Sequence, residues 1–305
     1  MTASSGMRAA MSRRPRRRAL LVLILAVVLL FVLVPLLVRL AADWFWFGSL
    51  GYERVFATRL VAEALLGLTV GAVAAAFLYV NLRMAQRGLV PDPLVVRLGA
   101  ATPPWDVTRL LQRLALPVAL GLGLLFGLAG ASEWLDVLRF VHRTPFGVSD
   151  PVFARDVAYY VFTVPVASDA LALITTLATL TVMIVATLYV LRRDVVVFRR
   201  TVTVEPAARL HLALLVALMF LTAALRVYFV RIPGLLYSTT GPLVGASYAD
   251  LHGGLLGLRL VAIAALGGAV LVLLGARTQR LGRNTLIAVG LYFGVSLLGV
   301  GLYPA

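Results

Sequence analysis

The chain alternates long apolar stretches with shorter polar ones, and this pattern predicts its architecture. A helix needs about 20 residues to cross a hydrocarbon core that is roughly 30 Å thick. The apolar stretches are continuous, they do not alternate with a period of two, and Leu, Ala, Val and Gly dominate them, which favours helices over strands. Seven stretches are long enough to cross a membrane: Ala19–Ala42, Ala57–Val80, Leu110–Ala131, Ala170–Leu191, Leu210–Val230, Leu255–Gly275 and Thr285–Tyr303.

Composition leads to the same class of protein. Of 305 residues, 61% are hydrophobic and 13% are charged, and the mean hydropathy is +0.98. A soluble domain is about half apolar and a quarter charged, so a soluble fold would lack polar residues for its surface. We therefore expect an all-α integral membrane protein, with seven transmembrane helices in one bundle.

The distribution of arginine predicts the orientation of this bundle. All 28 basic residues are arginine and the net charge is +15. The predicted spans divide the connections into two sides: one has nineteen arginines and four acids, and the other has nine of each. Arginine concentrates on the cytoplasmic side of membrane proteins. We expect a cytoplasmic N-terminus and an extracytoplasmic C-terminus.

The first 18 residues form a basic segment that precedes the seven-helix domain of residues 19–305. We expect this segment to be a disordered cytoplasmic tail. A cleaved signal peptide is the alternative, but the apolar run from Ala19 is longer than a signal peptide needs and six more spans follow. An uncleaved signal anchor is therefore favoured. Attraction to the lipid bilayer accounts for the basic charges, so we expect no nucleic-acid partner.

The sequence offers little for catalysis. It contains no cysteine, which excludes disulfides, thiolate metal sites and a cysteine nucleophile. It shows no phosphate-binding glycine loop with its lysine, no zinc-protease helix and no nucleophile–base pair. Asp250 and His252 are two candidate ligands where a metal site needs three or four, and His142 and His211 lie in other segments. We expect no enzyme activity, no cofactor and no metal.

Three polar connections lie on the predicted outer side. The first, Asp43–Glu53, is rich in Trp and Phe, which is typical of a membrane-interface belt; a lipid or quinone contact is the alternative. In the second, Ser132–Asp169, the segment Ser149–Pro151 resembles a helix start and predicts a short surface helix. The third, Arg231–Gly254, contains Asp250 and His252, which share a face only if the segment is extended.

Charges and small residues within the spans complete the pattern. Arg59 and Glu63 are four residues apart and can pair on one helix face. Arg226 and Arg259 lie near the outer ends of their spans, where long side chains reach the interface. The centre of the bilayer is almost free of ionisable groups, which argues against a carboxylate relay. Four pairs of glycines spaced four apart favour close helix packing: Gly67/Gly71, Gly123/Gly127, Gly253/Gly257 and Gly290/Gly294.

Several motifs in the polar connections carry a resemblance to a known family. They are Asp43–Phe47, Leu50–Tyr52, Val55–Phe56, Pro145–Phe146, Ser149–Phe153, Arg155–Phe162, Pro165, His211–Leu212, Leu235–Ser238, Gly245–His252 and Leu302–Pro304. Together they resemble uncharacterised protein family 0182, a family of bacterial multi-pass membrane proteins. The resemblance implies a multi-pass position in a bacterial cytoplasmic membrane and a seven-span module followed by a large extracytoplasmic domain, and it implies no catalytic residues. The predicted seventh span ends two residues before Ala305, so we expect a truncated form, a fragment or a split gene.

From these features we expect a membrane anchor or scaffold for an extracytoplasmic domain or partner subunit, in an oligomeric state that the sequence leaves open. The alternative is a transporter or lipid-handling protein, which would need a polar or wide cleft between the spans. A membrane-embedded enzyme, the third possibility, would need ionisable groups that converge in one cavity. The candidate docking or ligand contacts are Asp150, Arg155, Asp156, Arg226, Asp250, His252 and Arg259.

Overall fold

The computed structural model describes residues 4–87, 95–96, 105–192, 194–198, 201–239 and 244–302. The chain divides into two compact units, Met1–Val61 and Ala62–Ala305. The first unit contains helix α1 (Ser4–Ser49) and the start of helix α2 (Glu53–Gln86). Helix α1 is longer than the predicted span at both ends, and its backbone includes most of the basic segment for which the sequence predicts a disordered tail.

A tight turn joins α1 to α2 within the first unit. The amides of Leu50 and Tyr52 both donate to the carbonyl of Phe47, and Gly51 has a φ of 72°, a left-handed conformation that favours glycine. The ring of Phe56 on α2 packs against those of Phe47 and Trp44, with centroids 5.4 and 6.1 Å away. The aromatic residues of this connection therefore pack the turn together.

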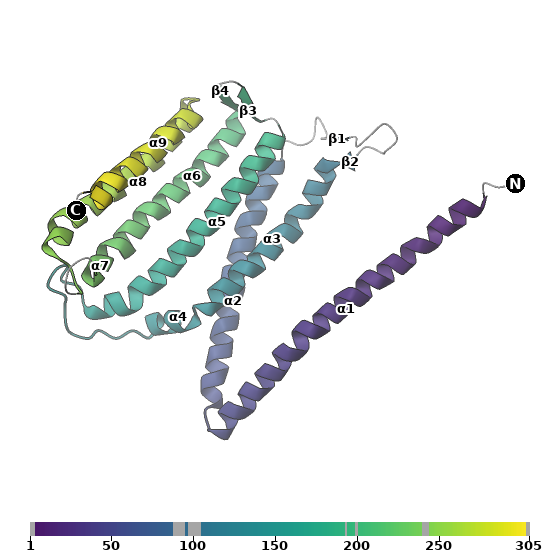
Figure 1. Cartoon of the computed structure of the whole chain (residues 1–305), viewed down its shortest axis with the longest axis horizontal. Helices are drawn as coiled ribbons and strands as arrows, with labels where there is room; N and C mark the ends of the chain where they lie inside the picture. The colour runs from purple at the N-terminus through teal and green to yellow at the C-terminus, as the bar shows by residue number, and fades with distance from the viewer. Residues whose placement is uncertain are drawn as a thin grey trace. The chain divides into compact units, whose positions relative to one another are not determined.

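The second unit is a bundle of helices with small additions at its two ends (Figure 1). Two antiparallel hairpins, β1 (Val95–Val96) with β2 (Trp105–Asp106) and β3 (Val195–Phe198) with β4 (Thr201–Val204), lie at what we call the hairpin end. The opposite end carries the short helix α4 and is called the α4 end. Besides α2, the helices are α3 (Val107–Ser132), α4 (Trp134–Val141), α5 (Val164–Leu191), α6 (Pro206–Arg226), α7 (Ile232–Gly234), α8 (Leu255–Arg277) and α9 (Leu281–Ser296).

Helices α5, α6, α8 and α9 pack in chain order, each against the next. Each of them carries a π-helical segment, with its wider i→i+5 turns, and all four segments lie at the α4 end. The 3-10 turn Leu235–Tyr237 follows α7. The four π-helical segments are Tyr159–Thr163, Val227–Arg231, Asp250–Gly254 and Leu297–Leu302.

The described residues contain seven helices that are long and apolar enough to cross a membrane, so the predicted seven helical spans are confirmed by length and composition. The structure extends several of them, since the fourth runs from Tyr159 to Leu191 and the fifth from Pro206 to Tyr237. The two hairpins and α4 are additional elements that the hydrophobic pattern does not predict, because they are too short to leave a periodic signal.

Alanine is frequent in the interior of the bundle, while many large apolar residues face outward. Ala213, Ala265 and Ala288 are fully buried between α6, α8 and α9. On the outer faces of α8 and α9, Ile263 is 64% exposed and Leu286 is 75% exposed. So large an exposed apolar surface is rare in a soluble protein, whereas it suits contact with lipid. Small interior residues also let helices approach closely. This arrangement fits a membrane protein.

Two glycine pairs form a seam between α2 and α3. A Cβ atom added at Gly127 would lie 2.6 Å from the carbonyl oxygen of Gly67, and one added at Gly71 would lie 3.0 Å from that of Gly123. Gly257 of α8 meets the backbone of Gly299 in the same way. By contrast, apart from the backbone of α9 itself, no atom of the described residues lies within 4 Å of a Cβ added at Gly290 or Gly294. The predicted packing role is confirmed for the first two pairs, and the described residues show no close packing at the last pair.

Candidate functional site

The second connection is organised around the carboxylate of Asp150. Its Oδ1 accepts hydrogen bonds from the amides of Val152 (2.8 Å) and Phe153 (2.6 Å). Its Oδ2 accepts from the amide of Arg155 (3.0 Å) and the hydroxyl of Tyr160 (2.5 Å). Burial alone would raise the pKa of Asp150, but these hydrogen bonds outweigh it and lower the pKa below its usual 3.8.

The same contacts correct the prediction of a surface helix that begins at Ser149–Pro151. The segment is a turn, since Ala154 has a φ of 53° and donates its amide to the carbonyl of Asp150. Helical structure begins only at Val157 and continues into the long span. An aspartate that bonds amides two and three residues ahead stabilises a turn as readily as a helix start, which is why the sequence pattern was misleading.

Asp156 is the second carboxylate that organises this connection. Its carboxylate accepts hydrogen bonds from the amides of Phe146 (3.1 Å), Gly147 (2.9 Å) and Ala158 (2.8 Å). The hydrogen bonds from Ala158, Phe146 and Gly147 lower the pKa of Asp156. Gly147 has a φ of 72°, a conformation that favours glycine, and this orients its amide toward the carboxylate. Both aspartates therefore shape the loop through its own backbone.

A surface hollow of about 600 Å³ lies beside this framework at the α4 end. It brings together a cation, an anion and a phenol, from Arg143, Asp156 and Tyr159. The guanidinium of Arg143 lies 4.2 Å from the ring centre of Phe140 and donates to its carbonyl at 2.9 Å. The Tyr159 hydroxyl is buried and has no hydrogen-bond partner within the described ranges. The hollow is lined by Val141, Arg143, Thr144, Pro145, Asp156, Ala158, Tyr159 and Thr163.

Arg155 connects this loop to the neighbouring helix. Its guanidinium carbon lies 4.3 Å from the ring centre of Tyr159, and one of its nitrogens lies 3.5 Å from the hydroxyl of Tyr228. Tyr228 belongs to the π-helical segment that follows α6. A cation over an aromatic face is favourable, which holds the Arg155 side chain in place, and its contact with Tyr228 links the loop to the segment that follows α6.

The third connection contains a helix cap. The hydroxyl and amide of Ser247 donate to Oδ2 of Asp250 at 2.8 and 3.0 Å, and the amide of Asp250 is 3.1 Å from the Ser247 oxygen. This reciprocal arrangement is a capping box. Asp250 is buried, whereas His252 is exposed and stacks on the ring of Tyr248 at 3.9 Å. Because the segment is helical, Asp250 and His252 do not share a face, and the structure does not bring them together.

Arg226 and Arg259 lie on the exposed surfaces of α6 and α8. Neither lines the hollow beside the second connection. Of the seven predicted contacts, Asp156 alone lines that hollow, and Asp150 and Arg155 lie in the loop behind it.

A buried polar network crosses three helices near the hairpin end. Nε2 of His211 on α6 lies 2.7 Å from Oδ1 of Asn81 on α2, and its Nδ1 lies 2.8 Å from the hydroxyl of Tyr189 on α5. The Asn81 amide nitrogen donates to the carbonyl of Phe77, so Oδ1 is the acceptor and Nε2 carries the proton. His211 is 5% exposed. A histidine that bonds both neighbours links the three helices to one another.

More polar groups surround this network toward the hairpins. Arg192 pairs with Asp194 at 3.1 Å and donates to the carbonyl of Ala85. Burial raises the pKa of Asp194, although Arg192 opposes the shift and Glu205 adds to it. Gln86 donates to the carbonyl of Leu111 at 3.0 Å. The hairpin end is therefore held together by charged and amide groups that belong to several helices.

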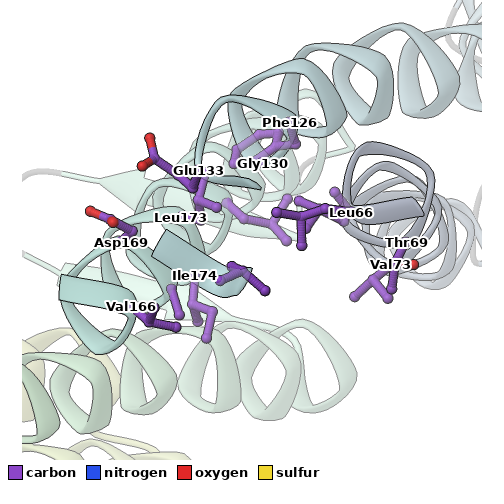
Figure 2. Close-up of a pocket in the computed structure, with 15 residues that line it drawn as sticks. Leu66, Thr69, Val73, Phe126, Gly130, Glu133, Val166, Asp169, Leu173 and Ile174 are labelled. Carbon is purple, nitrogen blue, oxygen red and sulfur yellow. The ribbon is translucent and has the colours of Figure 1, made fainter. Parts of the chain in front are cut away.

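A separate apolar cavity of about 330 Å³ lies between α2, α3 and α5, and α4 contributes to its wall (Figure 2). Leu66, Phe126 and Leu173 are typical of its lining. Glu133 and Asp169 also line it, and Figure 2 shows their carboxylates side by side at one end, directed away from the apolar lining.

Comparison with known proteins identifies the family. The family model described as Uncharacterised protein family (UPF0182) matches residues 20–305, which is nearly the whole chain. The chain belongs to this family. The expected resemblance is thus confirmed, and the UPF0182 family itself has no specific function assigned to it.

The UPF0182 relatives are bacterial and much longer than this chain. A UPF0182 protein of Cupriavidus necator is 35% identical over 76% of the chain and 26% of its own length. Another, of Pelobacter propionicus, is 31% identical over 92% of the chain and 31% of its own length. One of Desulforamulus reducens is 28% identical over 96% and 33%, respectively. The chain thus spans about a quarter to a third of these relatives. No solved structure matches it.

Two features of this UPF0182 chain were missed by sequence reasoning. The network around His211 unites residues that lie up to 130 positions apart in the sequence, which no local pattern reveals. The acidic group at the apolar cavity combines Glu133, Asp136 and Asp169. A partial signal existed here, because Glu133 and Asp136 are three residues apart and share a helix face.

Proposed function

We propose that this UPF0182 chain is a membrane anchor whose α4 end docks an extracytoplasmic domain or partner subunit. In this proposal the bundle lies in the bacterial cytoplasmic membrane with the hairpin end in the cytoplasm. The imbalance of arginine between the two sides of the membrane supports this orientation.

The hollow beside the second connection is the observation that carries the proposal. Its walls are fixed before any partner arrives, because Asp150 and Asp156 bind the amides of their own loop. It offers Arg143, the ring of Tyr159 and apolar wall residues together, a mixture that suits a polypeptide partner. A rigid surface loses less entropy on binding than a flexible one, which favours docking.

The size of the relatives supports the same proposal. Since the chain covers 26% to 33% of three relatives, most of each relative lies outside the matched region. A seven-helix module within a longer protein has a clear use as an attachment point for that remaining part. That this remaining part docks on the bundle belongs to the proposal.

The transporter alternative has less support. The cavity between α2, α3 and α5 and the smaller crevice between α8 and α9 are lined mainly by apolar side chains. A route for a polar solute needs polar groups along its length. For the membrane-embedded enzyme, Glu133 and Asp169 do converge at the apolar cavity, but their carboxylates are directed away from its lining (Figure 2), so we do not propose a reaction there.

Photo-crosslinking tests the docking proposal directly. A photo-reactive residue replaces exposed Thr144 in the hollow, and a matched variant carries it at Ile263, on the exposed face of α8. In cells of the native host, we expect Thr144 to give one product with an extracytoplasmic polypeptide and Ile263 to give none. The additional substitution Arg143→Ala should reduce the yield from Thr144. Crosslinks from Thr144 to lipid alone, or to cytoplasmic proteins, would contradict the proposal.

A further inference from the structure

The apolar cavity between α2, α3 and α5 has the shape of a chain-binding site. Its lining follows α2 from Leu66 to Ala74 and α5 from Val166 to Leu177. At 1.5 Å per residue these stretches are about 12 and 17 Å long, so the cavity is elongated along the helices. Its volume of about 330 Å³ lies within the range of ligand sites. Water does not fill apolar cavities of this kind, and empty ones forfeit packing contacts.

One end of the cavity is bordered by acidic residues, since Glu133 and Asp169 line it and Asp136 lies beside them. Carboxylate oxygens of Glu133, Asp136 and Asp169 all lie within 4.8 Å of one another. Asp136 pairs with Arg139 at 3.2 Å, and Glu133 accepts a hydrogen bond from Ser132 at 3.2 Å. In the described part of the chain, Asp169 has no basic partner. The carboxylates therefore outnumber the arginine, and a further positive charge would relieve their repulsion.

The position of this acidic end matches the level of lipid headgroups. Asp169 precedes Leu191, the end of α5, by 22 residues. This corresponds to about 33 Å of helix, close to the thickness of the hydrocarbon core. Glu133 directly follows Ser132, the last residue of α3. With the span that the sequence predicts, Ala170–Leu191, we expect the carboxylates at the polar boundary and the apolar lining beneath them, in the hydrocarbon.

We propose that this cavity binds a membrane lipid with an ammonium headgroup. Its acyl chain lies against Leu66, Phe126 and Leu173, and its ammonium lies among the three carboxylates. A metal ion would use the acidic end alone and leave the apolar cavity empty. An anionic lipid would bring its headgroup charge against the carboxylates. An ammonium lipid satisfies both parts of the site, and this binding is independent of the docking proposed above.

Native mass spectrometry of the full chain tests the proposal. The protein is purified in detergent and mixed with equal amounts of phosphatidylethanolamine and phosphatidylglycerol that carry the same acyl chains. We expect the phosphatidylethanolamine adduct to exceed the phosphatidylglycerol adduct by about fivefold. The double variant Glu133→Gln/Asp169→Asn should remove this preference. Leu173→Trp, which fills the cavity, should remove the adducts of both lipids.

Two matched controls keep these outcomes interpretable. Glu205→Gln removes an exposed acid at the hairpin end, and Ile263→Trp adds the same ring to an exposed face of α8. Both should bind lipid as the unmodified chain does. If Leu173→Trp does not fold, the double variant Glu133→Gln/Asp169→Asn still tests the proposal, because its substitutions lie at the edge of the cavity. Equal adducts of the two lipids, a preference that survives in the double variant, or Mg²⁺ binding that displaces phosphatidylethanolamine would each overturn the proposal.

Discussion

The hydroxyl of Tyr160 donates a hydrogen bond of 2.5 Å to Oδ2 of Asp150. Tyr160 lies in the first turn of the long fourth span, and it is 5% exposed. Asp150 lies ten residues earlier, in the turn of the second connection. The bond therefore ties the loop to the helix that follows it and sets the position of the hollow at the α4 end.

Removal of this carboxylate should weaken the whole fold. Asp150→Ala leaves three amides and the Tyr160 hydroxyl without their acceptor, so we expect the free energy of unfolding to fall by about 2–4 kcal/mol. Tyr160→Phe removes one bond and should cost about 1 kcal/mol. Thermal unfolding of the purified chain in detergent measures both. Tyr248→Phe, at an exposed ring, is the control; equal effects of Asp150→Ala and this control would be inconsistent with the described loop.

The same two aspartates predict a dependence of stability on acid. The pKa values of Asp150 and Asp156 lie below 3.8 in the folded chain. A carboxylate with a lowered folded pKa stabilises the fold above its unfolded value, and this contribution is lost as pH falls through the folded pKa. We expect the unfolding temperature to drop below about pH 3.8.

This acid-dependent drop should be smaller in Asp150→Asn and in Asp156→Asn. The measurement is thermal unfolding at a series of pH values from about pH 7 to about pH 2.5. Thr144→Ala, an uncharged change in the same loop, should preserve the full drop. A drop of the same size in both asparagine variants would assign it to other groups.

The network around His211 should behave as a coupled unit. Asn81→Ala leaves the Nε2–H of His211 unpaired and should cost about 2–3 kcal/mol, while Tyr189→Phe should cost about 1 kcal/mol. In a double-mutant cycle, Asn81 and His211 should couple by more than about 0.5 kcal/mol. Denaturant unfolding in detergent provides these values. Thr222→Val serves as the reference, because the Thr222 hydroxyl bonds only within its own helix among the described groups; additive effects at Asn81 and His211 would refute the coupling.

Glycine substitutions should separate packed from unpacked positions. Gly127→Ala places a methyl group 2.6 Å from the Gly67 carbonyl oxygen, so α2 and α3 must move apart. We expect a loss of about 1–3 kcal/mol. The methyl group of Gly290→Ala meets no neighbouring element within 4 Å in the described part of the chain and should stabilise the helix by about 0.5–1 kcal/mol. The same unfolding measurement compares the two, and a similar loss at both positions would contradict the glycine seam.

The orientation can be tested without background labelling, because the chain has no cysteine. Val148 at the α4 end is 61% exposed, and Glu205 at the hairpin end is exposed. We expect a membrane-impermeant maleimide to label Val148→Cys in intact cells and Glu205→Cys only after lysis, since arginine-rich connections face the cytoplasm. The reverse pattern would invert the proposed topology.

The sequence predicted the spans well because membrane crossing imposes a length and an apolar composition on each helix. It also identified Gly67/Gly71 and Gly123/Gly127 as packing positions, although their spacing alone could not distinguish them from Gly290/Gly294. The difference depends on which helix lies opposite, and that is a property of the tertiary structure.

The candidate site was less predictable for the same reason. The sequence singled out Asp150 and Asp156 as charged residues in a long loop, but it could not show that their own loop amides surround them. It placed Asp250 and His252 together only for an extended segment, whereas the segment is helical. Asp169 joins Glu133 only because α5 returns beside α3, more than 30 residues later.

The four π-helical segments at the α4 end have a consequence for the loops that they adjoin. A π turn contains one residue more than an α turn. In regular α-helix, the loss or gain of one residue rotates the preceding chain by about 100° around the axis. The wide turn at Tyr159–Thr163 takes up its extra residue locally, so the chain on both sides keeps nearly the orientation that it would have without that residue. The Asp150 turn should therefore keep its place on the bundle when one residue is lost from this segment, and lose that place when one is deleted from the middle of α5.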